Sequence, residues 1–327
     1  MHCLTTIFRK QIVAMFLSLF LVSGGSVWAQ FDGQYSQYMN NLCLINPSYS
    51  GSQSMIQASL FERLQWIGMP GAPVVSMLSV DAPFKLMGTE HGAGIQFVSD
   101  VFGVFNNQQV RLLYSYKYDL GSAGRISFGA NIGMLNIICY GDSINLTKIS
   151  QDDGYHTSND PLIPIGTQTG VGFDVGLGVN YSNNNYRLGV SLTHINSPTI
   201  ALGEKTNFKV LPFMQVHGGY TFAISGEDYK LHTNLLYASD FVTWRSHLSA
   251  IFDIKDQFWI GVGYQFPTTV SLMAGIKIFD GLKIGYNFDL PINPLITRTF
   301  GSHELFATYE FSFFRERSKA SKSIRIL

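Results

Sequence analysis

The sequence has few charged residues, few cysteines and no long hydrophobic run beyond its N-terminus. Charged residues make up 13% of its 327 residues, about half the share of an average soluble protein. Lysine plus arginine and aspartate plus glutamate both number 22, so the net charge is zero and nucleic acid is not an expected partner. No run of eighteen apolar residues follows the N-terminal region, which excludes a helical membrane protein.

The three cysteines are too few for a disulfide framework. Cys3 lies in the expected signal peptide, which leaves Cys43 and Cys139. These two are distant in sequence and lack metal-ligand spacing. A single disulfide therefore stays open, and no metal site is expected from them.

The first residues are typical of a secretory signal peptide. Arg9 and Lys10 precede an apolar run over 12–22, and residues 27–29 have a small-x-Ala cleavage pattern. The apolar run is too short to span a bilayer, and no cysteine stands at a lipoprotein position. We therefore predict a signal peptide over residues 1–29 and an exported protein.

What the sequence has in abundance is strict alternation of apolar residues with polar or small ones. Val171, Phe173 and Val175, for example, alternate with Gly172 and Asp174. A strand sends alternate side chains to opposite faces, so each such segment has one apolar face. Fourteen segments follow this pattern, at 54–64, 73–82, 91–99, 106–118, 124–137, 171–182, 185–195, 211–224, 229–239, 245–254, 257–266, 269–279, 281–289 and 304–314.

The length and spacing of these segments predict an all-β fold, a transmembrane antiparallel β-barrel of about 14 strands over residues 54–314. A strand of about ten residues crosses a membrane when tilted, whereas soluble strands centre on about five or six. Tight connections alternate with long ones such as 138–170 and 196–210. In outer-membrane barrels the short turns are periplasmic and the long loops external, so we expect both termini to be periplasmic.

A secreted β-sandwich is the soluble alternative. Its strands would be shorter, and its aromatic residues would not gather at strand ends. Here they do, at Tyr116, Tyr118, Tyr181, Tyr186, Tyr229, Tyr237 and Phe313. Aromatic girdles at the two membrane interfaces require this placement, so the membrane barrel is favoured.

Residues 30–53 precede the first strand and contain a turn at Asn46–Pro47 and Gly51 rather than a span. A barrel of fourteen strands is wide enough to be a channel unless something fills it. We therefore predict that this segment is a lumenal plug, with its tyrosines on lumen-facing glycines, or that it is a periplasmic docking segment. Residues 315–327 form a basic tail, which is a candidate periplasmic contact for an acidic partner.

Several charged residues fall on the face of the strands opposite the apolar one. They either stabilise a closed lumen or line a channel, and the sequence leaves both open. These lumen-facing residues are Arg111, Lys117, Asp174, Arg187, Lys230, Asp253, Lys277 and Lys283.

Motifs for catalysis are weak throughout the sequence, so no enzyme activity, cofactor or metal is predicted. The glycines at 170, 172, 176 and 178 alternate with apolar residues inside a strand, which favours small lumen-facing residues over a nucleotide-binding loop. His217 and His232 lie on neighbouring strands, where polar lining is the favoured interpretation. Asp142, Asp152, Asp153 and Asp160 form a possible site for a hard cation, but they lack the regular spacing of a calcium loop, which favours solvated loop acids.

Two stretches near the N-terminus carry a family resemblance. "FDGQYSQYMNNLCLINPSYSGS" (31–52) and "LFERLQWIGMPGAPVVSMLSVDAPF" (60–84) resemble the PorP/SprF family of type IX secretion system membrane proteins of the Bacteroidetes. The matching residues are Tyr38, Asn46, Pro47, Tyr49, Gly51, Arg63, Gln65, Trp66, Gly71, Ala72 and Pro73. The ending "GSHELFATYEFSF" (301–313) is similar to the C-terminal motif of the family, and the matching residues are Gly301, His303 and Glu304. Ser48 and Ser50 depart from the pattern, because the family usually has alanines there.

This resemblance implies an outer-membrane component of type IX protein secretion, and of gliding motility in part of the family. It implies binding to periplasmic, peptidoglycan-associated parts of the machine and to secreted adhesins or other substrates with C-terminal secretion domains. Outer-membrane lipid is the other expected contact. The alternative is a channel or transporter for small or hydrophobic molecules, with the N-terminal segment as a hatch.

Overall fold

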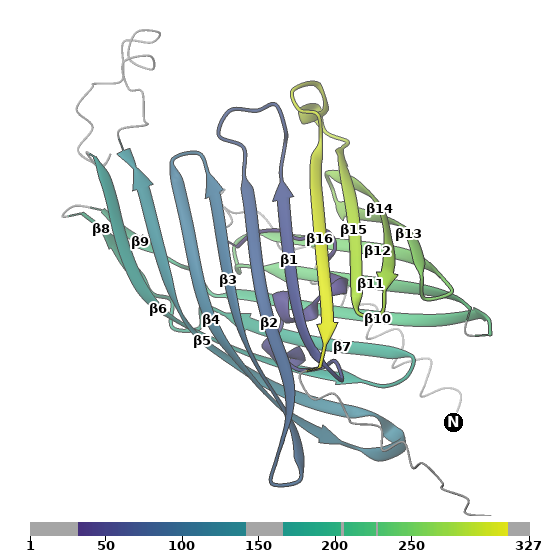
Figure 1. Cartoon of the computed structure of the whole chain (residues 1–327). Helices are drawn as coiled ribbons and strands as arrows, with labels where there is room; N and C mark the ends of the chain where they lie inside the picture. The colour runs from purple at the N-terminus through teal and green to yellow at the C-terminus, as the bar shows by residue number, and fades with distance from the viewer. Residues whose placement is uncertain (1–31, 142–165, 204–205, 227, 313–327) are drawn as a thin grey trace, which may run out of the picture.

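Fourteen strands close into one antiparallel barrel in a computed structural model that describes residues 32–141, 166–203, 206–226 and 228–312. Strands next to each other in sequence pair with each other, and β1 (Ile56–Leu64) pairs with β16 (Ser302–Phe311) to close the ring (Figure 1). The prediction of an all-β barrel of fourteen strands is confirmed. The expected signal peptide and the basic tail lie outside the described residues.

The other twelve barrel strands follow the sequence pattern closely. They are β2 (Val74–Leu86), β3 (Thr89–Phe102), β4 (Phe105–Asp119), β5 (Arg125–Tyr140), β6 (Thr167–Ser182), β7 (Tyr186–Thr193), β10 (Phe213–Ser225), β11 (Tyr229–Ser239), β12 (Trp244–Ile254), β13 (Phe258–Phe266), β14 (Thr269–Phe279) and β15 (Leu282–Pro291).

The barrel has an apolar outer face and a largely polar inner face. Leu60, Leu112 and Leu248 are each about half exposed on the outside. Buried polar residues alternate with them along the same strands, such as Ser59 and Arg111. A soluble protein has the opposite arrangement, with apolar residues inside and polar residues outside. An apolar outer face suits a barrel surrounded by lipid. In the part of the chain that the structure describes, no helix has the length and hydrophobicity to cross a membrane.

Aromatic side chains contact one another near the two ends of the barrel. Tyr181 and Tyr186 lie 5.6 Å apart between ring centroids at the β6–β7 turn. At the opposite end, Trp244 stacks on Phe266 at 5.6 Å. These two belts correspond to the two membrane interfaces of an outer-membrane barrel.

Two connections are shorter than the sequence pattern suggests. β2 and β3 are joined at residues 87–88, and β3 and β4 at residues 103–104. Gly88 and Gly103 supply the positive φ that these turns require, at +81° and +56°. The strands therefore continue beyond the segments in which their side chains alternate strictly.

A second sheet was not predicted. β8 (Thr199–Leu202) and β9 (Thr206–Lys209) form a separate hairpin within the connection from β7 to β10. Ile200 and Leu202 of this hairpin are buried against Leu135, Ile137 and Cys139 on the inner face of β5. The hairpin therefore covers part of the lumen.

We use two names for the ends of the barrel. The turn end carries the tight β4–β5, β6–β7, β10–β11 and β12–β13 connections, and the loop end carries the β7–β10 connection with its hairpin. β1 starts and β16 ends at the turn end, because Ile56 pairs with Phe311.

Candidate functional site

The N-terminal segment, residues 32–53, lies inside the barrel. It contains three short 3-10 turns: η1 (Tyr38–Asn40), η2 (Leu42–Leu44) and η3 (Pro47–Tyr49). They form the coiled ribbon at the start of the coloured chain in Figure 1. The side chains of Asn41 and Asn46 accept hydrogen bonds from the backbone amides of Cys43 and Ser48. Asparagine caps of this kind, with Pro47 at the first position of η3, explain why this polar stretch folds into turns.

The segment runs the length of the lumen. At the loop end, the backbone oxygen of Gly33 accepts a hydrogen bond from Arg245 near the start of β12. At the turn end, the backbone amide of Gly51 donates to Asp81 at 2.7 Å, and Lys117 donates to the backbone oxygen of Gly51. The first described residue, Asp32, and the last, Ser312, therefore lie at opposite ends of the barrel. The expectation that both termini lie on one side of the membrane is not supported, because the chain crosses the lumen before β1 begins.

A buried group that we call the carboxylate clamp fixes the start of the segment. Arg63 Nη1 lies 2.6 Å from Asp289 Oδ2 and 3.1 Å from Glu304 Oε2. The backbone amides of Ser36 and Gln37 donate to the two oxygens of Glu304 at 2.8 and 2.7 Å. All three charged side chains are at most 2% exposed.

The clamp also holds the Ser36 hydroxyl. This hydroxyl donates to Asp289 at 2.6 Å and accepts from Arg63 at 2.9 Å and from Gln265 at 2.7 Å. Ser271 and Asn287 donate to the other oxygen of Asp289. All four oxygens of the two buried carboxylates therefore accept hydrogen bonds, as a buried charge requires.

Closure of the barrel brings together two motifs that are far apart in sequence. Arg63 on β1 and Glu304 on β16 are directly paired in the strand register. Arg63 also contacts Asp289 on β15, a residue for which the sequence indicated only a polar strand face. In the sequence, Asp289 is recognisable only as a polar residue that shares the inner strand face with Asn287. This pattern does not reveal that Asp289 pairs with Arg63.

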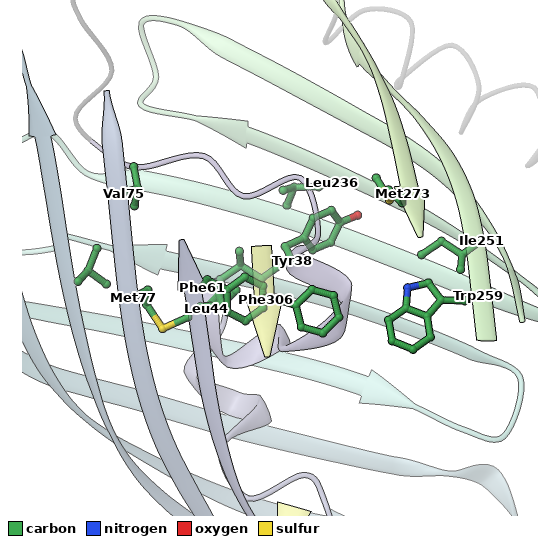
Figure 2. Close-up of a cluster of buried hydrophobic side chains, with 12 residues drawn as sticks. Tyr38, Leu44, Phe61, Val75, Met77, Leu236, Ile251, Trp259, Met273 and Phe306 are labelled. Atoms are coloured by element: carbon green, nitrogen blue, oxygen red, sulfur yellow. The ribbon is translucent and has the colours of Figure 1, made fainter. Parts of the chain in front are cut away.

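An apolar cluster forms beside the clamp (Figure 2). Tyr38 and Leu44 of the N-terminal segment pack with Phe61, Met77, Trp259 and Phe306 from the barrel wall, together with Ile45, Val75, Val98, Leu236, Ile251 and Met273. Phe61 and Phe306 stack at 5.4 Å between centroids on the paired strands β1 and β16. Apolar burial and polar contacts thus hold the same part of the segment.

Glycines of the wall leave room for the turn at Asn46–Ser50. A Cβ at Gly178 would lie 2.1 Å from the Asn46 side-chain oxygen, and one at Gly129 would lie 2.2 Å from the Ser48 backbone nitrogen. A Cβ at Gly92 would lie 1.9 Å from the backbone oxygen of Ser50. Only glycine permits such a close approach of two backbones.

The three tyrosines of the segment pack on other rings, with Tyr35 at 6.2 Å from Phe61 between centroids. Tyr38 contacts the ring of His247 at 5.8 Å and Tyr49 that of His217 at 5.3 Å between centroids. The glycines therefore receive the turn at 46–50, and the prediction that they receive the tyrosines was wrong. Ser48, which departs from the family pattern, donates to Asn46 at 2.6 Å and accepts from Asn180 at 2.8 Å.

A second charged network lies where the segment starts. His194 follows β7, has φ of +55° and is fully buried. Its Nδ1 lies 2.8 Å from Asp174 and its Nε2 lies 3.0 Å from Asp32. Arg111 lies 3.6 Å from the other oxygen of Asp174. Because a carboxylate accepts at each ring nitrogen, this geometry suits the doubly protonated imidazolium.

Burial and charge have opposite effects on this pair. Burial of His194 disfavours its charged form, but the charge of Asp32 and the hydrogen bonds to Asp174 and Asp32 outweigh burial and raise the pKa of His194 to about 9. Burial likewise favours the neutral form of Asp32, yet the charge of His194 lowers the pKa of Asp32 below its usual range. In sequence His194 is an ordinary isolated histidine, so this contact was not predicted.

The remaining family residues lie at the loop end. Gln65 donates its backbone amide to Pro73, just before β2, and Trp66 donates its backbone amide to Ser302 at 3.0 Å. The backbone oxygen of Gly71 accepts from Gly103. With Gln34 and Arg63, Gln65 and Trp66 line a cavity of about 150 Å³.

Two residues of the C-terminal motif, Gly301 and His303, lie against side chains of β15. Gly301 has φ of +86°, and a Cβ there would lie 2.7 Å from the ring of Phe288. His303 hydrogen-bonds to the hydroxyl of Tyr286 at 2.5 Å. These contacts fix the β15–β16 connection and keep Glu304 in register with Arg63.

The lumen-facing charges fall into two groups. Arg111, Lys117 and Asp174 are buried and contact the networks described above. Arg187, Lys230, Asp253, Lys277 and Lys283 lie toward the turn end, where Lys230 pairs with Asp256 at 3.1 Å, Lys277 with Asp280 at 3.3 Å and Lys283 with Glu310 at 3.6 Å.

Cys43 and Cys139 are free and buried in separate apolar clusters, so they form no disulfide. His217 contacts Asn46 at 3.2 Å, whereas His232 hydrogen-bonds to Thr221 at 2.9 Å. No metal-binding group of histidine, cysteine or acidic residues occurs among the described residues, and the acidic stretch 142–160 lies outside them.

A closed barrel of fourteen strands with an apolar outer face and two aromatic belts defines an outer-membrane β-barrel protein. The family model for the type IX secretion system membrane protein PorP/SprF matches residues 27–309. The chain therefore belongs to this family, as the sequence resemblance indicated. No curated protein sequence matches the chain significantly.

Solved structures resemble the chain in fold. The Ralstonia pickettii toluene transporter TbuX is 11% identical, with a TM-score of 0.50 over 89% of this chain and 96% of that chain. The CymD monoaromatic hydrocarbon channel is 13% identical, with a TM-score of 0.49 over 89% and 98%. The Acinetobacter baumannii outer membrane protein Omp33 is 7% identical, with a TM-score of 0.46 over 80% and 100%. At these identities the likeness concerns the fold alone.

Proposed function

We propose that the protein serves type IX secretion as a closed, non-catalytic outer-membrane barrel that binds other components of the machinery. The observation that carries this proposal is the N-terminal segment, which runs through the lumen and is fixed by the carboxylate clamp. A barrel with such a filled interior is better suited to hold partners than to conduct solutes.

The strength of these contacts supports a permanently seated segment. Arg63, Asp289 and Glu304 are buried and paired, and removing one partner of such a group is strongly destabilising. The apolar cluster around Tyr38 adds burial at the same place. In this proposal the segment is a plug, and partners bind at the two ends of the barrel.

The partners that we propose follow from the family. At the turn end, which we assign to the periplasm, they are peptidoglycan-associated proteins of the secretion machine. At the loop end, they are secreted adhesins or other substrates with C-terminal secretion domains. A role in gliding motility would use the same surfaces.

Deletion of the gene in its host tests the proposal. We expect loss of secreted and surface-anchored substrates, and restoration by the intact gene. A matched control is complementation with a Leu112→Ala variant, because Leu112 lies on the apolar outer face of β4, away from the clamp and from both ends of the barrel. Normal secretion and normal surface adhesin levels in the deletion strain would contradict the proposal.

The alternative is an outer-membrane channel for small or hydrophobic molecules, with the N-terminal segment as a hatch. It requires the segment to leave the lumen in the resting protein. A steady open conductance of the intact chain in a planar bilayer would favour this alternative over the binding role.

A further inference from the structure

A cavity of about 380 Å³ lies in the turn-end part of the lumen. Its volume is within the range of small-molecule pockets. Strands β7 and β11 to β15 contribute its wall, and Met39 and Asn40 line it from the N-terminal segment. Because Asp256 and Lys283 on its lining are exposed, the cavity is reached from the turn end.

Arg187 is positioned in this cavity without a carboxylate partner. Gly219 on the paired strand leaves room for its guanidinium, since a Cβ there would lie 3.0 Å from Arg187 Nε. The guanidinium donates to the side-chain oxygen of Asn234, whose amide in turn donates to Ser249 at 3.3 Å. Among the described residues no acidic side chain forms an ion pair with it. Its remaining donors are available to a ligand.

Two further cations face the same cavity from its opposite side. Lys277 on β14 and Lys283 on β15 are directly opposite each other in the strand register. Like charges in this position repel each other, and each lysine is paired with an acidic residue that does not line the cavity. Their partners Asp280 and Glu310 engage one oxygen each, at 3.3 and 3.6 Å, so each ammonium has donors to spare.

The indole of Trp259 supplies an unpartnered donor. Trp259 lines the cavity and is 8% exposed, and its ring nitrogen is buried without a hydrogen-bond partner. Figure 2 shows Trp259 beside Ile251, another lining residue. A buried N–H without an acceptor is costly, which makes it a ready contact for a ligand oxygen.

The acidic residues of the cavity also make contacts within the protein. Asp256 is paired with Lys230 at 3.1 Å, and Asp253 accepts a hydrogen bond from the backbone amide of Asp256 at 2.9 Å. One oxygen of Asp253 has no hydrogen bond, and the remaining unused groups are the donors of Arg187, the two lysines and Trp259. Its apolar surface comes from Met39, Ile251 and the Trp259 ring.

We propose that this cavity binds a carboxylate that is attached to an apolar or aromatic group. The carboxylate lies between Arg187 and the Lys277–Lys283 pair and accepts from the Trp259 indole, and the apolar group packs on Met39 and Ile251. Two sources have this chemistry: a free organic acid and the C-terminal residue of a polypeptide. The site does not depend on the proposed role in secretion.

Isothermal titration calorimetry of the purified full chain in an uncharged detergent tests the site. The probes are N-acetylphenylalanine and its neutral amide, which differ only in the carboxylate. We expect the acid to bind and the amide to bind at least about tenfold more weakly, because charge-assisted hydrogen bonds are lost. Equal binding of acid and amide, or no binding of the acid, overturns the proposal.

Three variants locate the site. Arg187→Gln and Lys283→Gln should each weaken binding of the acid, by about tenfold for Arg187. Lys85→Gln removes a charge at the same end of the barrel but in a separate cavity, and should leave binding unchanged. Lys283 is 43% exposed, so its variant should fold even if Arg187→Gln does not. An unchanged affinity in a folded Lys283→Gln variant counts against the site.

A peptide comparison distinguishes the two sources. The peptide Ala-Ala-Phe with a free C-terminus is compared with N-acetylphenylalanine in the same titration. Tighter binding of the peptide supports a polypeptide terminus as the ligand, and tighter binding of the single residue supports a free organic acid. Since neither titration involves secretion, failure of the site leaves the gene-deletion result to decide the proposed function separately.

Discussion

Replacement of Arg63 by methionine should destabilise the barrel strongly. The change keeps a long side chain but removes the cation that lies 2.6 Å from Asp289 and 3.1 Å from Glu304, two carboxylates that are at most 1% exposed. Breaking a buried ion pair in this way typically costs about 3–5 kcal/mol. The hydrogen bond from Arg63 to the Ser36 hydroxyl is lost as well.

Two controls isolate the buried charge. Lys230→Met breaks an ion pair that is 26% and 67% exposed, so it should cost only about 0–1 kcal/mol. Combining Arg63→Met with Asp289→Asn and Glu304→Gln removes the uncompensated charge, and this triple variant should regain part of the loss. It will not regain all of it, because the amide introduced by Glu304→Gln has one oxygen and can replace only one of the two acceptors that Glu304 now offers to Ser36 and Gln37.

The measurement is urea unfolding in detergent micelles, followed by far-UV circular dichroism. The unfolding free energies are compared between variants that have the same m-value, which is the slope of unfolding free energy against urea concentration. A cost for Arg63→Met no greater than that for Lys230→Met would refute the reasoning, as would a triple variant less stable than Arg63→Met alone.

Three further predictions concern the N-terminal segment. The buried Cys43 thiol should resist maleimide in the folded chain in a Cys139→Ser background and react fully after unfolding. Fast labelling of the folded chain would contradict a seated segment. His194 has a folded pKa of about 9 against 6.5 in the unfolded chain, so its contribution to stability is fully present below pH 6.5 and is lost as the pH rises through about 9. The thermal midpoint should therefore fall between about pH 7 and pH 10, and His194→Gln should remove much of this fall; an equal fall in both proteins would refute the assignment. Gly178→Ala places a methyl 2.1 Å from the Asn46 side chain and should lower the unfolding free energy in urea by about 1–3 kcal/mol. The control Gly218→Ala, whose Cβ would meet nothing closer than 3.7 Å, should be near neutral. Similar effects of the two variants would argue against a close fit of the segment to the wall.

The strands were predictable because lipid imposes a simple rule on them. Along β6, Val171 and Phe173 face outward while Gly172 and Asp174 face inward, and this alternation is visible without any partner strand. The β8–β9 hairpin was not predictable in this way. Each of its strands has only four residues, and its burial comes from packing on β5 rather than from lipid.

The candidate site was predictable only in outline. The position of the segment before the first strand suggested a plug, and the resemblance named Arg63 and Glu304 as separate motifs. Their contact depends on the closure of β1 on β16, and Asp289, which also pairs with Arg63, is 226 residues from it in sequence. His194 and Asp32 are 162 residues apart, so local spacing carries no sign of their pairing.

The opposite placement of Asp32 and Ser312 also follows from the segment. Alternation and loop lengths describe only the strands, and they place both ends of the barrel sheet at the turn end. The segment then adds a passage through the lumen toward Arg245 and His194. A polar stretch with no strand pattern cannot show its direction from sequence alone.

Single-channel recording in planar bilayers tests most directly whether the segment closes the barrel. Two purified proteins are compared, the intact chain and a variant lacking residues 32–50. We predict no steady conductance for the intact chain and stable open channels for the variant, provided that circular dichroism shows it to be folded. A steady open channel formed by the intact chain, with the same conductance as the variant, would contradict a closed barrel that acts by binding partners.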